Sequence, residues 1–236
     1  MTQAPEERFY STQNALLGIP QLTPASGKAF APGRRYNIIA DSLQKEPLMS
    51  KKNIVELGCF KGESLMYAKK VFGFDKAVGI DISFENKYSN SAGDCEFYPA
   101  NLNMSWPFEN GSADVLIAMM LLEHLFDPFE SFREIKRVLS PSGRAFVNLP
   151  LITSFKNRAR LLFGQIPVTS VPYHLWQDEG HWDGFHLHYF TIRSIYDLAE
   201  FSGLRVTRIR SVGRFYQIKN MFPGLLCDEI SFELRN

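Results

Sequence analysis

The stretch 54–64, IVELGCFKGES, joins a predicted buried strand, a turn with two glycines and the start of a helix. Gly58 and Gly62 allow the backbone to turn tightly and to approach a ligand closely. Asp81 ends the next predicted strand, 23 residues after Gly58, and a carboxylate there can accept both hydroxyl hydrogens of a ribose. Glu56, at the end of the first strand, suits a cationic ligand. The pattern predicts a nucleoside site; a turn without a ligand and a plain surface carboxylate at Asp81 are the alternatives.

The same residues disfavour a ligand with a pyrophosphate. The dinucleotide pattern G-x-G-x-x-G requires glycines where this chain has Phe60 and Glu63. Glu63 would also repel phosphate at the start of the helix, where anions otherwise bind well. A Walker loop is excluded because the turn has no G-K-[ST]. A positively charged cofactor without phosphates fits better.

Histidines form a second group of residues that could do chemistry. A neutral imidazole is the natural general base near neutral pH. Most of the five histidines lie in one aromatic segment, HLWQDEGHWDGFHLHYF, and the fifth follows Glu123 in LLEHL. The candidate bases, in order, are His188, His186, His181 and His124. His186 and His188 are two apart and would share a face of an extended segment. The alternatives are hydrogen-bonded aromatic packing for the cluster and a helix-start pair for Glu123 and His124. The spacing matches no zinc signature, so no metal site is predicted.

The bulk composition limits the class of protein. The chain has 236 residues, 45% hydrophobic and 22% charged, with a formal net charge of +1. A charge so close to zero disfavours a nucleic-acid partner. The three cysteines are scattered and form no C-x-x-C pair, which is typical of a reducing compartment. The first residues show no signal peptide, and the apolar run 115–122 is too short to cross a bilayer, which takes about 20 residues. We therefore expect a cytoplasmic protein.

Strands and helices alternate along most of the chain. This rhythm predicts an α/β fold: a Rossmann-like, doubly wound, mostly parallel seven-stranded sheet with an antiparallel edge strand formed by 228–235. Asp127 and Pro128 predict the start of one helix, and Thr191 that of another. We expect strands at 52–57, 76–82, 95–101, 113–120, 144–150, 204–210 and 228–235, and helices at about 34–45, 63–73, 127–139 and 191–203.

The rhythm stops in two places, which suggests the domain organisation. Residues 1–35 are predicted to be an N-terminal arm, and 36–236 a single domain with a substrate-cap insertion at about 151–190. The insertion carries a basic segment, FKNRARLLFG, interpreted as a lid helix with a solvated face; contact with an anionic substrate is the alternative. Together with the arm it would cover an acceptor pocket rich in aromatics, namely Phe155, Phe163, Tyr173, Trp176, Trp182, Phe185 and Tyr189.

Five motifs in this order resemble class I S-adenosylmethionine-dependent methyltransferases of the small-molecule, type 11-like group. VELGCFKGES and VGIDIS are similar to motifs I and II of that family. The segment from ANLNMSWPF through LLEHLFDPFESFREIKRVLSPSG is similar to its central pattern, and HLHYFTIRSIYDLAEFSGL to its later one. The resemblance covers about residues 52–206. Phe60 departs from the family, which has a glycine there, and Asn101 stands where aspartate is commoner.

The resemblance implies a cofactor, S-adenosylmethionine, and the residues that bind it. The methionine part would lie against Glu56, Gly58, Cys59 and Gly62; Asp81 would hold the ribose; Ile82, Asn101 and Leu102 would meet the adenine; Met119 and Met120 would lie beside the sulfonium. Similar loops with an aromatic residue at the position of Phe60 occur among methyltransferases of sugars and natural products. We therefore expect the Phe60 ring to pack over the loop or the cofactor, with its amide facing the ligand.

The predicted function is methyl transfer to a small-molecule acceptor, by O- or N-methylation, with a sugar or natural-product-like compound as a candidate acceptor. No nucleic acid or membrane partner is expected, and the protein would be a monomer or homodimer. Nucleic-acid amine methylation is disfavoured because no [DN]-P-P-[FYW] motif follows the fourth strand. Two other classes stay open: a protein of this fold that binds S-adenosylmethionine without catalysis, and a nicotinamide-dependent oxidoreductase.

Overall fold

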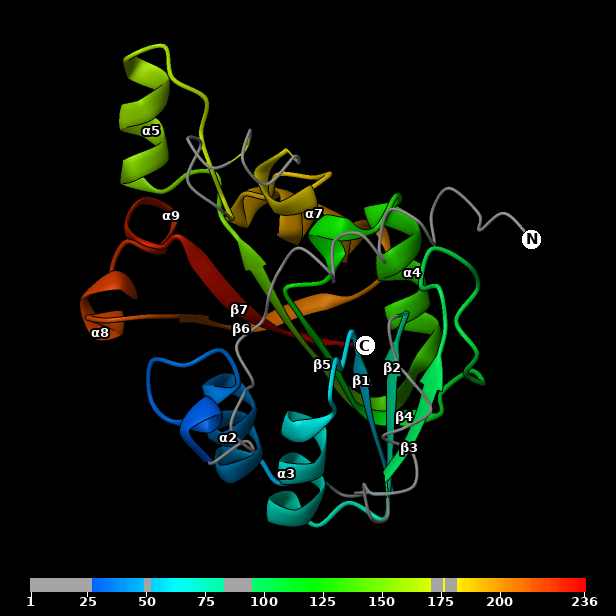
Figure 1. The fold of residues 1–236 in the computed structure, drawn as a ribbon. Helices are drawn as coiled ribbons and strands as arrows, with labels where there is room; N and C mark the ends of the chain where they lie inside the picture. The colour runs from blue at the N-terminus through cyan, green and yellow to red at the C-terminus, as the bar shows by residue number, and fades with distance from the viewer. Residues whose placement is uncertain (1–26, 49–51, 83–94, 171–175, 177–181) are drawn as a thin grey trace.

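The protein is built on one seven-stranded sheet. The computed structural model describes residues 27–48, 52–82, 95–170, 176 and 182–236. The strand order is β3-β2-β1-β4-β5-β7-β6 (Figure 1). The strands are β1 Asn53–Leu57, β2 Lys76–Asp81, β3 Cys95–Pro99, β4 Ala113–Met119, β5 Leu139–Pro150, β6 Arg205–Ser211 and β7 Glu229–Arg235. The predicted Rossmann-like, doubly wound, mostly parallel sheet is confirmed.

Helices cover both faces of this sheet (Figure 1). The α-helices are α2 Asn37–Lys45, α3 Glu63–Phe72, α4 Pro128–Val138, α5 Phe155–Leu162, α7 Ile192–Phe201, α8 Tyr216–Lys219 and α9 Pro223–Leu226. Short 3₁₀ segments lie at η1 Gly27–Phe30, η3 Leu122–His124 and η5 Asp183–Phe185. The predicted helix starts are confirmed: Asp127 caps α4 by accepting from two amides, and Thr191 forms a capping box with Ser194 at α7.

The alternation of side chains along the central strands creates two cores. In β1, Ile54 packs with α2 and α3, whereas Val55 and Leu57 pack with α4 and α7. Both faces of the strand are buried, so its sequence reads as a continuous apolar run, as expected for a parallel sheet covered on both sides. The one charged residue in the strand, Glu56, points to the α2–α3 side, where it contacts Tyr36.

One predicted strand position in the sheet and one predicted strand start were wrong. The last strand, β7, is antiparallel as predicted, but it lies between β5 and β6, so β6 takes the edge of the sheet. The strand β7 is buried on both faces, whereas the alternation in its sequence indicated only one buried face. Strand β5 begins at Leu139, because this residue pairs with Ala113 of β4 immediately after α4 ends.

The order of strands reverses between β1 and β4, which both run parallel and side by side. In open α/β sheets, ligands bind beyond the carboxyl ends of the strands at such a switch point. The two ends of the segment 151–190 meet directly after β5, since Leu151 forms a β-bridge with Phe190 and donates its amide to the carbonyl of Asp228. Helix α5, within this segment, extends away from the sheet (Figure 1). Residues 1–26 of the predicted arm lie outside the described residues, and the division into arm, domain and cap stays a prediction.

Candidate functional site

The glycine turn links β1 to α3 as predicted. Gly58 and Gly62 both have left-handed backbone angles, φ 65° and 72°. A side chain at Gly62 would meet the ring of Phe97 on β3 at 2.1 Å, and one at Gly58 would meet Leu121 at 3.1 Å. Gly62 is therefore required by the packing of the neighbouring strand as well as by the turn. Cys59 between them is buried, and its amide donates to the carbonyl of Ile80 at 3.0 Å.

Phe60 occupies the position in the turn where the family has a glycine. Its φ of 47° lies in the left-handed region, which costs a residue with a Cβ about 1–2 kcal/mol. Its amide donates to Oδ2 of Asp81 at 2.8 Å. The expectation that this amide faces the ligand is therefore wrong, because the carboxylate on β2 binds it instead. The bond ties the turn to the predicted ribose-binding residue, and the ring is half-buried beside Lys61.

Glu56 lies at the base of the turn in a buried position. It is 2% exposed, and Oε1 accepts a hydrogen bond from the Tyr36 hydroxyl at 2.5 Å. Oε2 has no hydrogen-bond partner among the described residues. Burial raises the pKa of Glu56 from 4.5 to about 7, with a smaller contribution from Asp81 in the same direction. A cationic group beside Oε2 would satisfy the oxygen and stabilise its charge, so the site fits the ammonium of a methionine moiety.

The predicted adenine contacts lie at the ends of β2 and β3. Ile82 follows β2 directly and is half-buried. Asn101 accepts from the backbone and side-chain nitrogens of Asn103 at 3.0 and 3.2 Å. Leu102 is buried, and its carbonyl accepts from the Trp106 indole. The local turn thus fixes the orientation of Asn101, and the carboxylate that is commoner at this position is not needed for that purpose.

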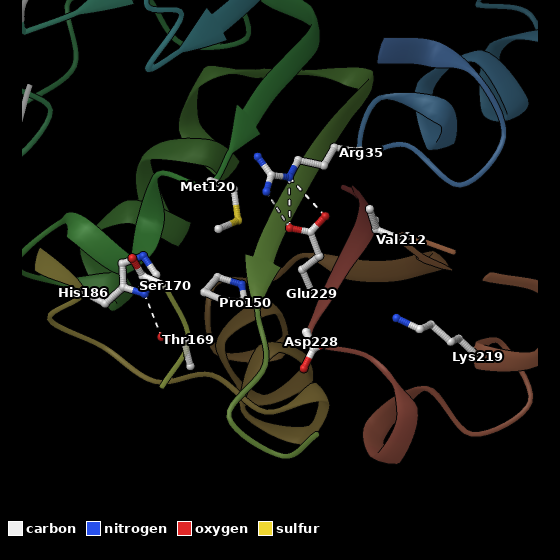
Figure 2. A pocket seen from close by; sticks show the side chains of 11 residues that line it. Arg35, Met120, Pro150, Thr169, Ser170, His186, Val212, Lys219, Asp228 and Glu229 are labelled. Atoms are coloured by element: carbon white, nitrogen blue, oxygen red, sulfur yellow. Dashed lines mark hydrogen bonds and ion pairs between the residues drawn. The ribbon is translucent and has the colours of Figure 1, made fainter. Parts of the chain in front are cut away.

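A cavity of about 490 Å³ opens beside the end of β4 (Figure 2). Met120, which follows Met119 at that end, lines it and has a left-handed φ of 52°. Most of the other lining groups are polar or charged. The lining residues are Arg35, Met120, Pro150, Thr169, Ser170, His186, Val212, Gly213, Lys219, Asp228 and Glu229.

The cavity differs in character from the predicted aromatic pocket. None of the described aromatics of the insertion lines it; Phe155 and Phe163, for example, are 66% and 77% exposed on and after α5. Tyr173 lies outside the described residues. Instead, Arg35 donates three hydrogen bonds of 2.7–3.1 Å to Glu229, as Figure 2 shows. This pair joins residues 194 apart in sequence, and sequence patterns offered no signal for it.

His186 is the predicted histidine that the structure places at the cavity wall. Its Nδ1 lies 2.7 Å from the hydroxyl of Thr169, which itself donates to Oδ2 of Asp183 at 2.7 Å. Because that hydroxyl hydrogen is used, His186 must donate from Nδ1, and its lone pair is on Nε2. Asp183 also accepts the amides of Thr169 and Ser170. Sequence reasoning missed Asp183, although the D-G step in HWDGF was a signal for a turn.

The backbone around Asp183 is held in an unusual conformation. Asp183, Gly184 and Phe185 have successive φ values of 36°, 64° and 62°. Left-handed angles at two residues with side chains are rare and persist where surrounding contacts fix them. A side chain at Gly184 would meet the Ser170 hydroxyl at 1.8 Å. The turn therefore holds Asp183 against residues 169–170 and thereby orients His186.

Glu123 and His124 lie next to His186. Glu123 is fully buried, and neither carboxylate oxygen has a hydrogen-bond partner within the described part of the chain. Its Oε1 is 3.9 Å from Nε2 of His186. The His124 ring meets that of His186 edge to face at 4.8 Å, and its Nδ1 lies 3.2 Å from the carbonyl of Phe185. Glu123, His124 and His186 thus form one cluster. The proximity of His124 to the transferred methyl group stays a prediction.

Burial controls the protonation of this cluster. It lowers the pKa of His124 to about 3 and that of His186 to about 4, so both imidazoles are neutral near pH 7. It raises the pKa of Glu123 to about 8. The donor atoms of Glu123, His124 and His186 all lie within 4.8 Å of one another. This arrangement can accept a proton or hold a cation; the sequence predicted neither the grouping nor a metal site.

His188, the first of the predicted bases, lies away from this cluster. His188 places Nε2 at 3.1 Å from the carbonyl of Phe126 and does not line the cavity. The ring of His186 contacts Thr169 instead, so the two histidines have different partners. Among the described residues, His186 rather than His188 therefore lines the cavity. His181 lies outside the described residues.

The sequence of the chain matches the model of a known family. The methyltransferase domain family matches residues 32–209. The chain belongs to this family. The family assignment made from the five motifs is therefore confirmed, and with it S-adenosylmethionine as the cofactor of the group.

Individual relatives resemble only part of the chain or share only its fold. A tRNA U34 carboxymethyltransferase of Campylobacter curvus is 26% identical over 48% of this chain and 38% of its own length. The chloroplastic tocopherol O-methyltransferase of Arabidopsis thaliana is 31% identical over 41% and 29%. The chain thus spans about a third of the length of these curated relatives. A solved Haemonchus contortus phosphoethanolamine N-methyltransferase 2, in complex with phosphomonomethylethanolamine and S-adenosylhomocysteine, has a TM-score of 0.62 at 13% identity, covering 98% of this chain and 58% of that one.

Two further predictions concern the cysteines and the membrane. Cys59, Cys95 and Cys227 are all buried thiols, and no disulfide joins any two of them. Among the residues that the structure describes, no helix combines the length and the apolar character required to cross a bilayer.

Proposed function

We propose that the protein is an S-adenosylmethionine-dependent methyltransferase that acts on a small-molecule acceptor bound in the cavity beside Met120. The observation that carries the proposal is this cavity, which begins at the end of β4 and is walled by charged groups from distant segments. A binding protein without catalysis would not require an acceptor site there. The acceptor would be methylated on oxygen or nitrogen.

The cofactor-binding residues of the proposal are those of the motif match. Glu56, Gly58, Cys59, Phe60 and Gly62 would surround the methionine part, and Asp81 would hold the ribose. The adenine would lie against Ile82, Asn101 and Leu102, with Met119 and Met120 beside the sulfur. The unpaired Oε2 of Glu56 supports the first contact, and the Phe60–Asp81 bond supports a turn that is already shaped for the second.

The lining of the cavity indicates the chemistry of the acceptor. Lys219 and the Arg35–Glu229 pair place charges of both signs around it, and Asp228 adds a further carboxylate. A polar acceptor with hydroxyl or amino groups, such as a sugar or a natural-product-like compound, would make hydrogen bonds there. A purely apolar acceptor would leave these groups unpaired, which is unfavourable. The relatives whose names include tRNA, tocopherol and phosphoethanolamine differ in acceptor and do not select one.

The mechanism relies mainly on positioning. When bound, the cofactor supplies an electrophilic methyl group on its sulfonium. Met120 and the glycine turn would fix its direction, and the cavity would hold the acceptor heteroatom in line with the carbon–sulfur bond. His186, neutral and with Nε2 as the lone-pair side, lies at the wall where the heteroatom would lose its proton. We place the reacting heteroatom of the acceptor beside His186, Glu123 and His124.

Calorimetry with S-adenosylmethionine, S-adenosylhomocysteine and NADH tests the cofactor. Binding of the first two without NADH is expected, whereas no binding at millimolar S-adenosylmethionine would refute the proposal. The enzyme is then screened against hydroxylated and aminated small molecules by following the release of S-adenosylhomocysteine. His186→Ala should lower turnover while cofactor affinity is unchanged. Full turnover in His186→Ala would exclude the cluster from catalysis.

A further inference from the structure

We propose that Glu123, His124 and His186 bind one divalent transition-metal ion, of the zinc or iron(II) type, at the wall of the acceptor cavity. The inference rests on the proposed function for the use of the ion, but the site itself follows from the three side chains alone. It differs from the sequence-based prediction, in which the spacing of the histidines indicated no metal site.

The donor set and its geometry suit such an ion. Two imidazole nitrogens and one carboxylate are typical ligands of zinc and iron(II), whereas magnesium and calcium prefer all-oxygen sites. The donor atoms lie within 4.8 Å of one another, and the carboxylate and His186 donors are 3.9 Å apart. Around a tetrahedral ion with bonds of about 2.0–2.2 Å, ligand atoms are roughly 3.3–3.5 Å apart. The cluster therefore has to contract by about an ångström to bind the ion.

Both imidazoles are already held in the orientation that a metal requires. His124 lies with Nδ1 at the Phe185 carbonyl, which can only accept, so Nδ1 carries the proton. His186 donates from Nδ1 to Thr169, whose hydroxyl is bonded to Asp183. In each ring the lone pair is therefore on Nε2. Metal-bound histidines are commonly fixed in this way, with the second nitrogen donating to a carbonyl or to a carboxylate network.

Glu123 supplies the independent observation that points to a cation. Its side chain is fully buried, yet both oxygens lack hydrogen-bond partners among the described residues. At 3.9 Å, the approach to His186 is too long for a hydrogen bond. Burying a carboxyl group without partners is costly. An ion between Glu123 and the two imidazoles would satisfy the group. Arg35, the nearby cation that faces the same cavity, is already paired with Glu229.

The position of the site suggests what the ion would do. His186 lines the cavity, so three protein ligands would leave a coordination position open toward the acceptor. A hydroxyl oxygen bound there would lose its proton to solvent more readily, because a metal ion lowers the pKa of a bound hydroxyl. The oxygen would then form its bond to the methyl carbon as the carbon–sulfur bond breaks, and the sulfur keeps the electron pair as a neutral thioether. The acceptor class would be a hydroxylated compound.

The test measures metal binding by the full chain after treatment with a chelator. Zinc is titrated by calorimetry, and cobalt(II) by its visible absorption, which reports the ligands directly. One ion per chain is expected. Glu123→Gln and His186→Ala should each weaken zinc binding at least 100-fold, and Thr169→Val about 10–100-fold, because it removes the hydrogen bond that orients His186. His188→Ala, whose imidazole lies outside the cluster, is the matched control and should bind zinc like the parent protein.

Equal zinc affinity in the parent protein, Glu123→Gln and His186→Ala would overturn the proposal, as would a parent protein that binds no ion. If one variant fails to fold, Thr169→Val gives the same comparison with a smaller change of shape. Calorimetry with S-adenosylhomocysteine is run on the same samples. Cofactor binding without zinc binding would refute the metal site and keep the proposed function. Zinc binding without cofactor binding would refute the proposed function and keep the metal site.

Discussion

The ionisation of Glu56 makes a sharp prediction about cofactor affinity. Its pKa of about 7 results mainly from burial, and the hydrogen bond from Tyr36 opposes this rise. A cofactor ammonium binds favourably only to the carboxylate form. The ionised fraction rises from about one tenth near pH 6 to about nine tenths near pH 8, so the affinity for S-adenosylhomocysteine should increase about tenfold over this range. Titration calorimetry at the two pH values measures the change.

Two variants separate this cause from other titrations. Glu56→Gln removes the carboxylate and should bind the ligand more weakly, with an affinity that no longer changes between about pH 6 and pH 8. Tyr36→Phe removes a hydrogen bond that lowers the pKa of Glu56, so the rise in affinity should move to higher pH. A tenfold pH effect that persists in Glu56→Gln, or a pH-independent affinity in the parent protein, would refute the assignment of Glu56 to the ammonium.

The same pKa has a consequence for the ligand-free protein. The carboxyl pKa is raised on folding from 4.5 to about 7, so the folded state binds the proton more tightly than the unfolded state. The stabilising contribution of protonated Glu56 is present below about pH 4.5 and is lost as the pH rises toward 7, by about 3 kcal/mol in total. Relative to the parent protein, Glu56→Gln should therefore gain unfolding free energy as the pH rises from about 5 to 8, as measured by urea denaturation.

Three further predictions concern residues of the turns. Phe60→Gly should relieve the left-handed strain of about 1–2 kcal/mol and change cofactor affinity by less than about tenfold, which urea denaturation and calorimetry check. A larger loss of affinity would show that the ring itself contributes. Gly62→Ala should destabilise by roughly 2–4 kcal/mol because its Cβ would lie 2.1 Å from the Phe97 ring, whereas Gly73→Ala, with open space around it, should cost only about 1 kcal/mol; equal losses would contradict the packing argument. Asp183→Asn weakens the bonds to residues 169–170 and should lower the unfolding free energy by about 1–3 kcal/mol, together with turnover; unchanged turnover would separate that turn from the reaction.

The sequence alone determined the frame of the cofactor site. The β1–turn–α3 unit, Asp81 at the end of β2 and the caps of α4 and α7 were all predicted, because each depends on residues close together in the chain. Glycine in a tight turn, an aspartate at an N-cap and an apolar strand act through local backbone geometry. Five such motifs in order were sufficient for the family and the fold. The turn accommodates Phe60 in a left-handed conformation, with φ 47°.

Only the tertiary structure decided the cavity that we propose as the acceptor site. His186 and Glu123 are 63 residues apart in the chain, and Arg35 and Glu229 are 194 apart. No periodicity relates such residues, since their meeting depends on the strand order and on the turn at Asp183. The composition of the insertion suggested aromatic walls, but several of its aromatics are exposed, and the cavity is bounded by charged groups from both ends of the domain. The fold places Glu123 beside the imidazoles of His124 and His186. Burial in that position raises the pKa of Glu123, and no local sequence pattern predicts this.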